Sequence, residues 1–493
     1  MRRELYEHSC GAHVWLLLTA AAILTLLACG VGITVFRSRH AAYDALAVQR
    51  TADGLRSDGR LSGGQVESAL RAIRPPNPLT IVVEASLDND FGYWDFGPGG
   101  YRVGSGALDA SHEVTPFGIT DVRHTVTIVL SLLALSLAWT SVADDRARGS
   151  LRALLAQPIQ PSAVFVGKYV SGALTLSLAV GLTLGIAAMV LAIHPTAAFS
   201  LTDWISLAAL AVPSVLFLLA NLSIGLLIGS VIPGYRPALI ATVLIWVFST
   251  LLVASAADSL PRMLWPTPPT DVVEAQYDEI AQAMFVRTQV EMGDAFGRTG
   301  HLPAISGAAL TTDPEGLRLA ESIWNRNMRA LRAELQQRRD TLSTTVSRRT
   351  AMENALRWLS PACVYWSVSA DLTGLGSAET ARWTESVHAY QGYLERALFD
   401  NRPRLTAQVS AAALGINAAG RALVTVERHA VPRVSQMTFF AAPHDSAWQR
   451  IRDAAPMLFV LLIYNVISFV LALITFTRVR LDISTQSASE SES

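Results

Sequence analysis

One short segment between two apolar stretches combines basic residues and leucines at a regular spacing. Leu151, Leu154 and Leu155 stand at positions i, i+3 and i+4, which places them on one face of a helix. Arg148 and Arg152 lie on another flank of the same helix. The segment therefore predicts a short amphipathic helix parallel to a membrane, bound either to a protein partner or to anionic lipid.

Further residues frame this amphipathic helix. Asp145 and Arg146 precede it, and Pro158 ends it because proline has no amide hydrogen to continue the helical bonding. Lys168, the only lysine of the chain, opens the next apolar stretch. This pattern suits binding to a partner or to lipid rather than bond-breaking chemistry.

Motifs for catalysis and cofactor binding are missing from the sequence. It contains no GxxxxGK[ST] phosphate loop, no HExxH, no GxSxG and no GxGxxG after a strand. The ten histidines and three cysteines show no metal-ligand spacing. With a net charge of -1, nothing draws the chain to nucleic acid. We therefore expect no enzyme, no metal and no cofactor of its own.

Six apolar segments are long enough, or nearly so, to cross about 30 Å of hydrocarbon. None contains Asp, Glu, Lys or Arg, and lipid forces such segments to be helical. Pro213 is expected to kink the fourth. The expected spans are Val14–Phe36, Thr125–Val142, Val170–Ile193, Ile205–Ile232, Ala238–Ala257 and Ala454–Thr477.

The absence of ionisable residues from these spans favours an energy source elsewhere, because ion-coupled transporters usually carry intramembrane charges. The polar residues that remain are mostly of the kind that makes bonds between helices. Three of them, Asn221, Tyr464 and Asn465, are candidates for a translocation path.

The spans divide the chain into 1–36, 37–124, 125–257, 258–453 and 454–493. Residues 37–124 and 258–453 are long polar inserts, whereas 143–169 is a short loop that holds Arg146, Arg148, Arg152 and Lys168. The positive-inside rule then places this loop and both termini in the cytoplasm and both inserts outside. The expected fold class is an α-helical polytopic membrane protein with six transmembrane helices and a mainly helical α+β extracytoplasmic domain.

Within the first insert, the patterns predict a helix over Tyr43–Ile73, a strand over Leu79–Val83 and a turn over Gly97–Gly106. The second insert predicts three helices and two strands. These are Asp271–Phe296, Pro314–Leu359 and Thr380–Phe399 as helices, and Leu405–Ala412 and Ala422–His429 as strands. A helix of about 40 residues reaches about 60 Å and would stand clear of the membrane.

The sequence Leu26–Gly30 resembles a lipoprotein cleavage signal at Cys29. The residues that follow stay apolar up to Phe36, so we expect Cys29 to lie inside a retained helix.

The segment after the second span resembles the permeases of ABC-2 type exporters. In that family an acid-x-x-x-Gly-[Thr/Ser]-Leu-x-x-Leu-Leu-x-x-Pro run follows the second span and a Gly-Lys opens the third, as Asp145 to Pro158 and Gly167-Lys168 do here. Arg3-Glu4-Leu5 is similar to the family's N-terminal opening. Arg74–Leu79, Leu359–Pro361 and Leu372–Gly374 resemble a subgroup with a large insertion between spans five and six, related to gliding-motility permeases.

This resemblance implies the permease subunit of an ATP-driven exporter in the bacterial inner membrane. Its partners would be a P-loop ATPase, which binds the ATP and Mg, a second permease half, identical or paralogous, and an extracytoplasmic partner. Two alternatives are a mechanotransmitting ABC assembly and a membrane-anchored sensor or scaffold. The implied ATPase-coupling residues are Arg3, Glu4, Asp145, Arg146, Arg148, Gly149, Ser150, Leu151, Arg152, Leu154, Leu155, Pro158 and Lys168.

Overall fold

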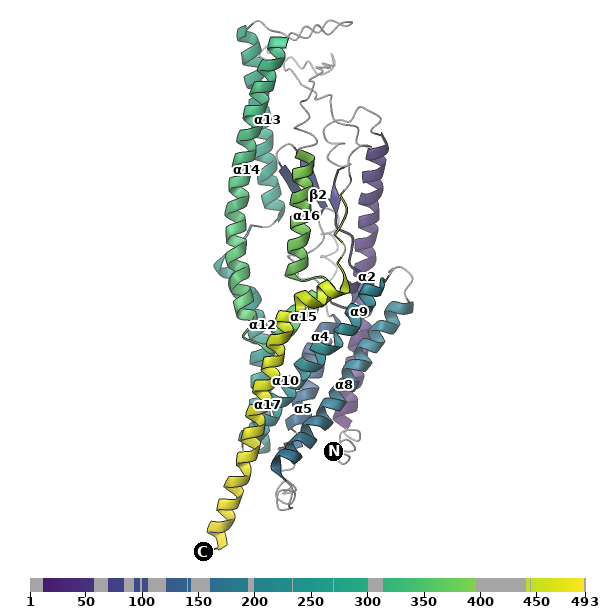
Figure 1. The fold of residues 1–493 in the computed structure, drawn as a ribbon, viewed down its shortest axis with the longest axis vertical. Coiled ribbons are helices and arrows are strands. Elements are labelled where there is room, and N and C mark those ends of the chain that lie inside the picture. Colours follow the sequence, from purple (N-terminus) through teal and green to yellow (C-terminus); the bar gives the residue numbers. More distant parts are fainter. Residues whose placement is uncertain are drawn as a thin grey trace.

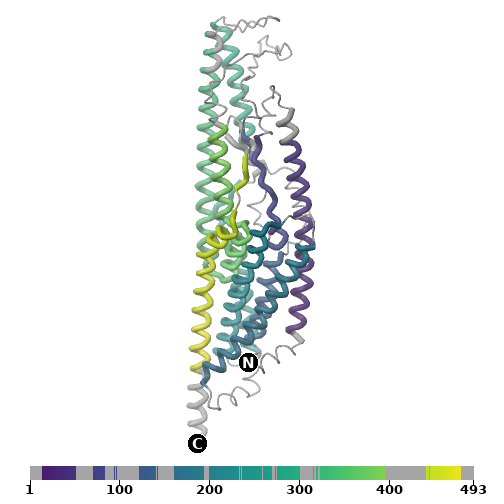
Figure 2. The backbone as a smooth tube through the Cα atoms, turned by 45° about the vertical axis from the view of Figure 1, so that its right-hand side comes forward, coloured from purple at the N-terminus to yellow at the C-terminus, as the bar shows by residue number. Residues whose placement is uncertain are grey.

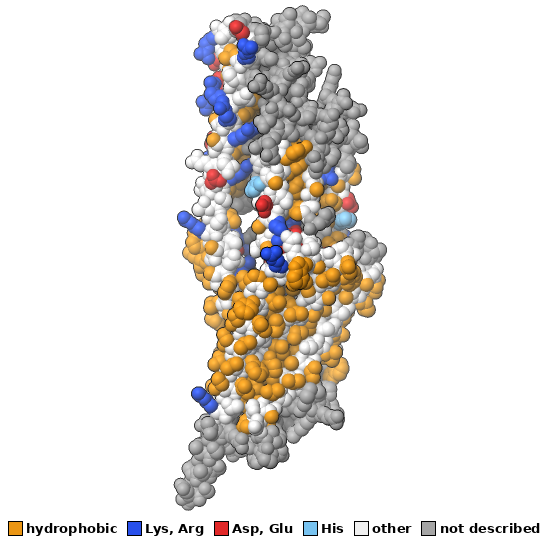
Figure 3. All heavy atoms as spheres, in the orientation of Figure 1, with side chains coloured by type: hydrophobic (Ala, Val, Ile, Leu, Met, Phe, Trp, Pro, Cys, Tyr) orange, Lys and Arg blue, Asp and Glu red, His pale blue; other side chains and the backbone are white. Residues whose placement is uncertain are grey.

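The computed structural model shows an elongated molecule with two unlike halves. One half is a helix bundle with an apolar surface, and the other carries the charged side chains (Figures 1 and 3). The structure describes residues 12–56, 70–83, 93–97, 100–104, 121–139, 141–142, 160–193, 199–232, 234–268, 270–299, 314–395, 440–443 and 445–491.

The six expected spans are all helical, and each is long and apolar enough to cross a membrane. Several are longer than the sequence predicts, because helices continue beyond the apolar stretch. The elements that contain them are α2 (Ala12–Arg56), α4 (Val122–His124) with η4 (Thr125–Leu130) and α5 (Ser131–Trp139), α8 (Pro161–Ile193), α9 (Leu201–Ala209) with α10 (Ala211–Val231), α11 (Tyr235–Trp246) with η6 (Val247–Leu252) and α12 (Val253–Leu264), and α17 (Ala447–Ser491).

The fourth span is interrupted at Leu210, between α9 and α10. Pro213 lies one turn further on and has no N–H to offer the carbonyl of Ala209, which explains an interruption at this point. The start of α9 is fixed by a capping box, in which Ser200 and Asp203 each bond the other's backbone N–H.

Two spans contain a turn of π-helix, η4 in the second span and η6 in the fifth. Hydrophobic periodicity does not predict them. A π-turn inserts a residue into the helical ladder and often marks a functional place in a helix.

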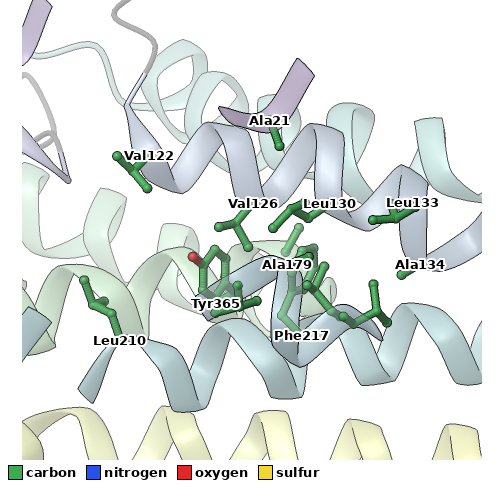
Figure 4. Packing of buried hydrophobic residues seen from close by; sticks show 14 of the residues in the cluster. Ala21, Val122, Val126, Leu130, Leu133, Ala134, Ala179, Leu210, Phe217 and Tyr365 are labelled. Carbon is green, nitrogen blue, oxygen red and sulfur yellow. The ribbon is translucent and has the colours of Figure 1, made fainter. Parts of the chain in front are cut away.

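The core of the bundle lies where the second, third and fourth spans meet. Val126, Leu130, Ala179 and Phe217 are all buried there (Figure 4). Tyr365, from the second insert, reaches into the same cluster. An element outside the six spans therefore belongs to the membrane core.

The first insert departs from three predictions, two of which concern its first half. The helix expected to begin at Tyr43 is the continuation of the first span, since α2 runs to Arg56, and its expected end is the strand β1 (Ala72–Ile73). The strand expected at Leu79–Val83 is wrong, because Pro78–Ile81 forms the 3₁₀ helix η1. The Asn77 side chain accepts a bond from the Leu79 N–H at 2.9 Å and so starts that helix.

The turn expected over Gly97–Gly106 is wrong in its middle, because Gly100–Gly104 forms strand β3. This strand pairs antiparallel with β2 (Tyr93–Gly97). Strand β1 pairs antiparallel with β2 and completes a sheet of order β1-β2-β3. Helix α16 (Ser377–Glu395) covers this sheet with Trp383 and Tyr390, which contact Trp94 and Phe96. This is the small α+β core of the charged half.

The second insert holds the helices that its periodicity predicts. Helices α13 (Thr270–Thr299) and α14 (Pro314–Arg357) form an antiparallel hairpin that projects from the apolar bundle (Figure 1). Helix α15 (Pro361–Thr373) was not predicted. The strands expected at Leu405–Ala412 and Ala422–His429 lie outside the described residues.

The inner contact of the hairpin is apolar. Tyr277, Ile280 and Met284 of α13 pack against Met328, Leu331 and Leu335 of α14.

The start of α2, the end of α17 and the ends of α5 and α8 that flank the short loop lie at one end of the bundle (Figures 1 and 2). The hairpin, the sheet and α16 lie at the other end. Cys29 is buried within α2, as expected for a residue of a retained span.

Candidate functional site

Most of the expected coupling residues lie outside the described part of the chain. They are Arg3, Glu4, Asp145, Arg146, Arg148, Gly149, Ser150, Leu151, Arg152, Leu154, Leu155 and Pro158. Their structural role stays a prediction. Lys168 is described, and so are the two helix ends between which the loop runs.

Lys168 ties the two spans that flank this loop. Its side chain is 4% exposed, and Nζ donates a hydrogen bond of 2.8 Å to the carbonyl of Ser141, at the end of the second span. A bond from a charged donor is worth about 1.5–3 kcal/mol, more than a bond between neutral groups. The ends of the second and third spans are thus held together directly beside the loop.

The same region of the third span packs on the end of the sixth. Phe165 is fully buried, with its ring centroid 5.5 Å from those of Phe469 and Phe476. Tyr169 meets Phe469 edge-on at 4.8 Å. A displacement of the loop would therefore reach the sixth span through the base of α8.

The three path candidates make three different contacts. Asn221 donates to Phe217 O of its own helix at 2.9 Å, and Asn465 donates to Leu216 O at 2.8 Å, so the two amides meet neighbouring carbonyls of α10. Tyr464 donates instead to Trp358 O at the base of α14. Asn221 and Asn465 thus bond adjacent carbonyls of the same span, whereas Tyr464 bonds the base of the hairpin.

Asn465 is the more informative of the two amides. It lies in α17 and also donates to Leu461 O at 2.9 Å, while its Oδ1 accepts no hydrogen bond from the described residues. An unsatisfied amide oxygen in a membrane core is costly. Whether a path passes here stays a prediction.

Helix α15 is the functional element that the sequence reading missed. It is inserted among the spans at the end of the bundle that faces the hairpin, and it contacts α17, α10 and α9. Ser360 caps it by accepting from Ala362 N at 3.1 Å, Pro361 opens it and Gly374 closes it with φ 71°. The sequence does contain signals for this helix, because Ser360-Pro361 is typical of a helix start and Gly374 of a helix end.

Helix α15 contacts both π-turns. Ser360 Oγ donates to the Ser249 carbonyl in η6 at 2.6 Å, and Trp366 Nε1 donates to Thr127 Oγ1 in η4 at 2.9 Å. The Ser360 bond goes to a backbone carbonyl of the π-turn and the Trp366 bond to a side chain of the other π-turn. The second and fifth spans are thus irregular where α15 bonds them.

The start of the second span forms a polar cluster around Trp366. Asp121 accepts from the His124 N–H at 2.7 Å and pairs with Arg123 at 3.3 Å. The Arg123 guanidinium lies over the Trp366 ring, 4.5 Å from its centroid, in a cation–π contact. This contact holds α15 against the second span from the side.

Three ion pairs, here called the collar, join the charged half of the molecule to the bundle. Arg382 of α16 pairs with Asp445 at 2.7 Å and with Asp453 of α17 at 2.6 Å. Arg450 of α17 pairs with Asp203 of α9 at 3.2 Å. These contacts couple the outer helices to the fourth and sixth spans.

Asp371, at the end of α15, lies within this collar and outside the six spans. The pKa of its carboxyl is raised to about 7, mainly by burial and also by the nearby Asp453, while Arg357 and Arg382 oppose the shift. A carboxyl at such a pKa changes charge near neutral pH.

Among the described residues, no group of histidine, cysteine, aspartate and glutamate could hold a metal ion. Together, six helices long and apolar enough to cross a membrane and the inserted helix α15 define a polytopic helical membrane protein. A family model described as ABC-2 family transporter protein matches residues 41–481. The chain belongs to this family and is a permease component of an ABC transporter. No curated protein matches the sequence significantly.

Proposed function

We propose that this permease is the membrane-spanning half of an ATP-driven exporter. Two halves pair in the membrane, and separate ATPase subunits dock on residues 143–169 and on Arg3 and Glu4. The subgroup with a large insertion between spans five and six, related to gliding-motility permeases, is part of this proposal. The termini and the loop face the cytoplasm of a bacterium, and the hairpin stands outside its inner membrane.

The observation that carries the proposal is the bond from Lys168 to Ser141 O. It joins the end of the second span to the start of the third, so a force on either end moves both spans. The basic residues of the loop supply the docking charge, and their number on this side satisfies the positive-inside rule.

Helix α15 supports the second part of the proposal, a gate at the outer end. It bonds the second span through Trp366 and the fifth through Ser360, and Tyr365 reaches the fourth. When the ATPases close, a tilt of these spans would move α15 and open an exit. ATP binding then shifts the population between two arrangements of the bundle.

The experiment begins with the tagged full chain, purified from its native membrane with any P-loop ATPase that accompanies it. ATP hydrolysis by the reconstituted complex is measured for Arg148→Glu/Arg152→Glu and for the wild type. We expect the charge reversal to abolish stimulation by the permease. The matched control is Arg318→Glu/Arg329→Glu on the exposed face of α14, which should hydrolyse ATP normally.

Absence of a co-purifying ATPase, or full stimulation after the loop reversal, would contradict docking at this loop. It would favour the sensor or scaffold reading, in which the loop binds another cytoplasmic protein.

The projecting hairpin favours one other function, mechanotransmission to an outer partner without passage of cargo. Tyr464 of the sixth span donates to Trp358 O at the base of α14, and so links that span to the hairpin. Transport of cargo into sealed proteoliposomes decides between the two functions: ATP-dependent accumulation identifies an exporter, and hydrolysis without accumulation identifies a mechanotransmitter.

A further inference from the structure

Helix α13 carries a second seam in addition to the one that contacts α14. Its residues are spaced alternately by four and three, the repeat of a helix that packs along another helix. The members are Val272, Gln276, Glu279, Ala283, Val286, Val290, Gly293 and Gly297. We call this set the outer seam.

The outer seam faces away from α14. At 100° per residue, Val286 and Val290 lie on the side of the helix opposite Tyr277, Met284 and Thr288, which face the hairpin core. Val286 is 60% exposed and Val290 is 47% exposed. A helix with exposed apolar residues opposite its packed face is suited to a second helical neighbour. Among the described elements, α14 is the helix that packs along α13, which also touches strand β3.

Among the α14 side chains that the structure describes, no such second seam occurs. The side chains on the face opposite its core are polar, which is what a solvated helix face requires. They include Arg318, Ser322, Asn325, Arg329, Gln336, Asp340, Ser343 and Ser347. Two helices of one hairpin thus share the same surroundings but differ in their outward faces, and Glu279 is the only charge in the outer seam.

Lipid does not cover the outer seam. The hairpin projects beyond the apolar surface of the bundle, in the half of the molecule that carries the charged side chains (Figures 1 and 3). A row of exposed valines in that position points to a protein partner rather than to acyl chains.

We propose that the outer seam binds α13 of a second copy of this chain, as a parallel pair of helices above the membrane. The inference rests on the pairing of two permease halves in the proposed function. Two copies with the same orientation in one membrane are related by an axis along the membrane normal, so α13 meets its own counterpart in parallel and in register. Each seam residue then faces itself.

The seam suits this self-pairing. Val286 and Val290 form apolar layers, and Gly293 and Gly297 let the two backbones approach closely at the far end. The flanking positions place Gln289 of one copy beside Asp294 of the other, which are complementary in hydrogen bonding. The two Glu279 side chains meet as like charges and weaken the pair at one layer.

The area of the seam limits what it can do alone. From Val272 to Gly297 it runs about 39 Å, and at a width of about 10 Å it covers on the order of 400 Å² per copy. That is about half of what a stable interface buries. The pair therefore needs a contact within the membrane as well. The fifth span, which leads directly into α13, can supply it, because only 22% of its most apolar part is buried within one copy.

The test is disulfide cross-linking of the full chain in its native membrane. Val286→Cys places a thiol in the seam, and Ser343→Cys places one on the exposed face of α14 as a matched control. Cys29 and Cys363 are buried, and the oxidised wild-type chain gives the background. We expect a cross-linked homodimer for Val286→Cys at least tenfold above the control. Equal yields, or a cross-link to another polypeptide, overturn the inference.

Two further variants test the energetics by the dimer fraction at fixed dilution. Glu279→Leu removes the like-charge layer and should raise the dimer fraction, while Val286→Glu/Val290→Glu should lower it. A dimer fraction that stays at the wild-type value in both variants overturns the inference. If the chain is dimeric and stimulates its ATPase but does not cross-link at the seam, the seam inference alone fails. If the chain is monomeric and fails to stimulate an ATPase, the proposed function fails with it.

Discussion

Tyr365 stacks on Phe217 with ring centroids 5.0 Å apart and an interplanar angle of 12°. One ring comes from the short helix α15 and the other from the fourth span (Figure 4). The Tyr365 hydroxyl also bonds Ser214 Oγ at 3.1 Å, one turn earlier in the fourth span. This stack is the central contact through which an element of the outer insert belongs to the membrane bundle.

The stacked ring of Tyr365 should be essential for stability, whereas the Tyr365 hydroxyl should matter less. Tyr365→Ala removes a fully buried ring and is expected to cost about 3–5 kcal/mol. Tyr365→Phe keeps the ring and loses one hydrogen bond, worth about 1 kcal/mol, leaving the Ser214 hydroxyl its bond to Leu210 O. The apparent melting temperature of the purified chain in detergent measures both. Equal losses for Ala and Phe would mean that the hydroxyl, not the ring, holds α15.

Lys168 should couple as well as stabilise, if the loop is the input of force. Lys168→Met keeps the length of the side chain but loses the donor to Ser141 O. We expect ATPase stimulation to fall about tenfold, together with the modest fall in melting temperature that the loss of one hydrogen bond brings. Lys168→Arg keeps a charged donor and should restore part of the stimulation. Normal ATPase stimulation by the Lys168→Met variant would show that this bond has only a structural role.

The spans and the two hairpin helices could be predicted from the sequence because length and apolar periodicity determine them. Helix α15 could not, since its 13 residues are too few to cross a membrane and too mixed to show a face. The expected strand at Leu79–Val83 failed because tertiary contact decides that segment. Asn77 caps η1 and also donates to Thr373 O at 2.8 Å, across 296 residues of chain.

The π-turns were equally hidden from sequence reading. Their bonds to Ser360 and Trp366 come from a part of the chain more than a hundred residues away. Asn221, Tyr464 and Asn465 all lie inside the spans, as predicted, and their role in a translocation path stays a prediction. The bond from Tyr464 to Trp358 O depends on where α14 ends, which the sequence does not show. Most of the loop predictions lie outside the described residues.

Asp371 should make the protein less stable as the pH rises. Its pKa is raised by burial to about 7 in the folded chain, so the folded state holds a proton that the unfolded state releases near pH 4. The stabilisation by this proton is present at low pH and is lost as the pH rises through about 7. We expect the melting temperature to fall by a few degrees between pH 5 and pH 8, and Asp371→Asn to remove that slope. Asp340→Asn, at an exposed site on α14, is the control and should keep it.

Gly32 should be irreplaceable at the crossing of the first span and η1. A Cβ at this position would lie 2.5 Å from the carbonyl oxygen of Ile81, and because backbone cannot rotate away, even alanine forces the two elements apart. We expect Gly32→Ala to lower the melting temperature, at a cost of about 1–3 kcal/mol for overpacking.

Gly30, two residues earlier in the same helix, has nothing within 4 Å of its would-be Cβ. Gly30→Ala is therefore the matched control, and it should raise the melting temperature slightly because alanine favours a helix over glycine. The opposite signs follow from contact alone, since both changes add the same methyl group to the same helix. If both variants are stabilised, then α2 and η1 do not touch as described, and the first insert is not anchored on the first span at this point.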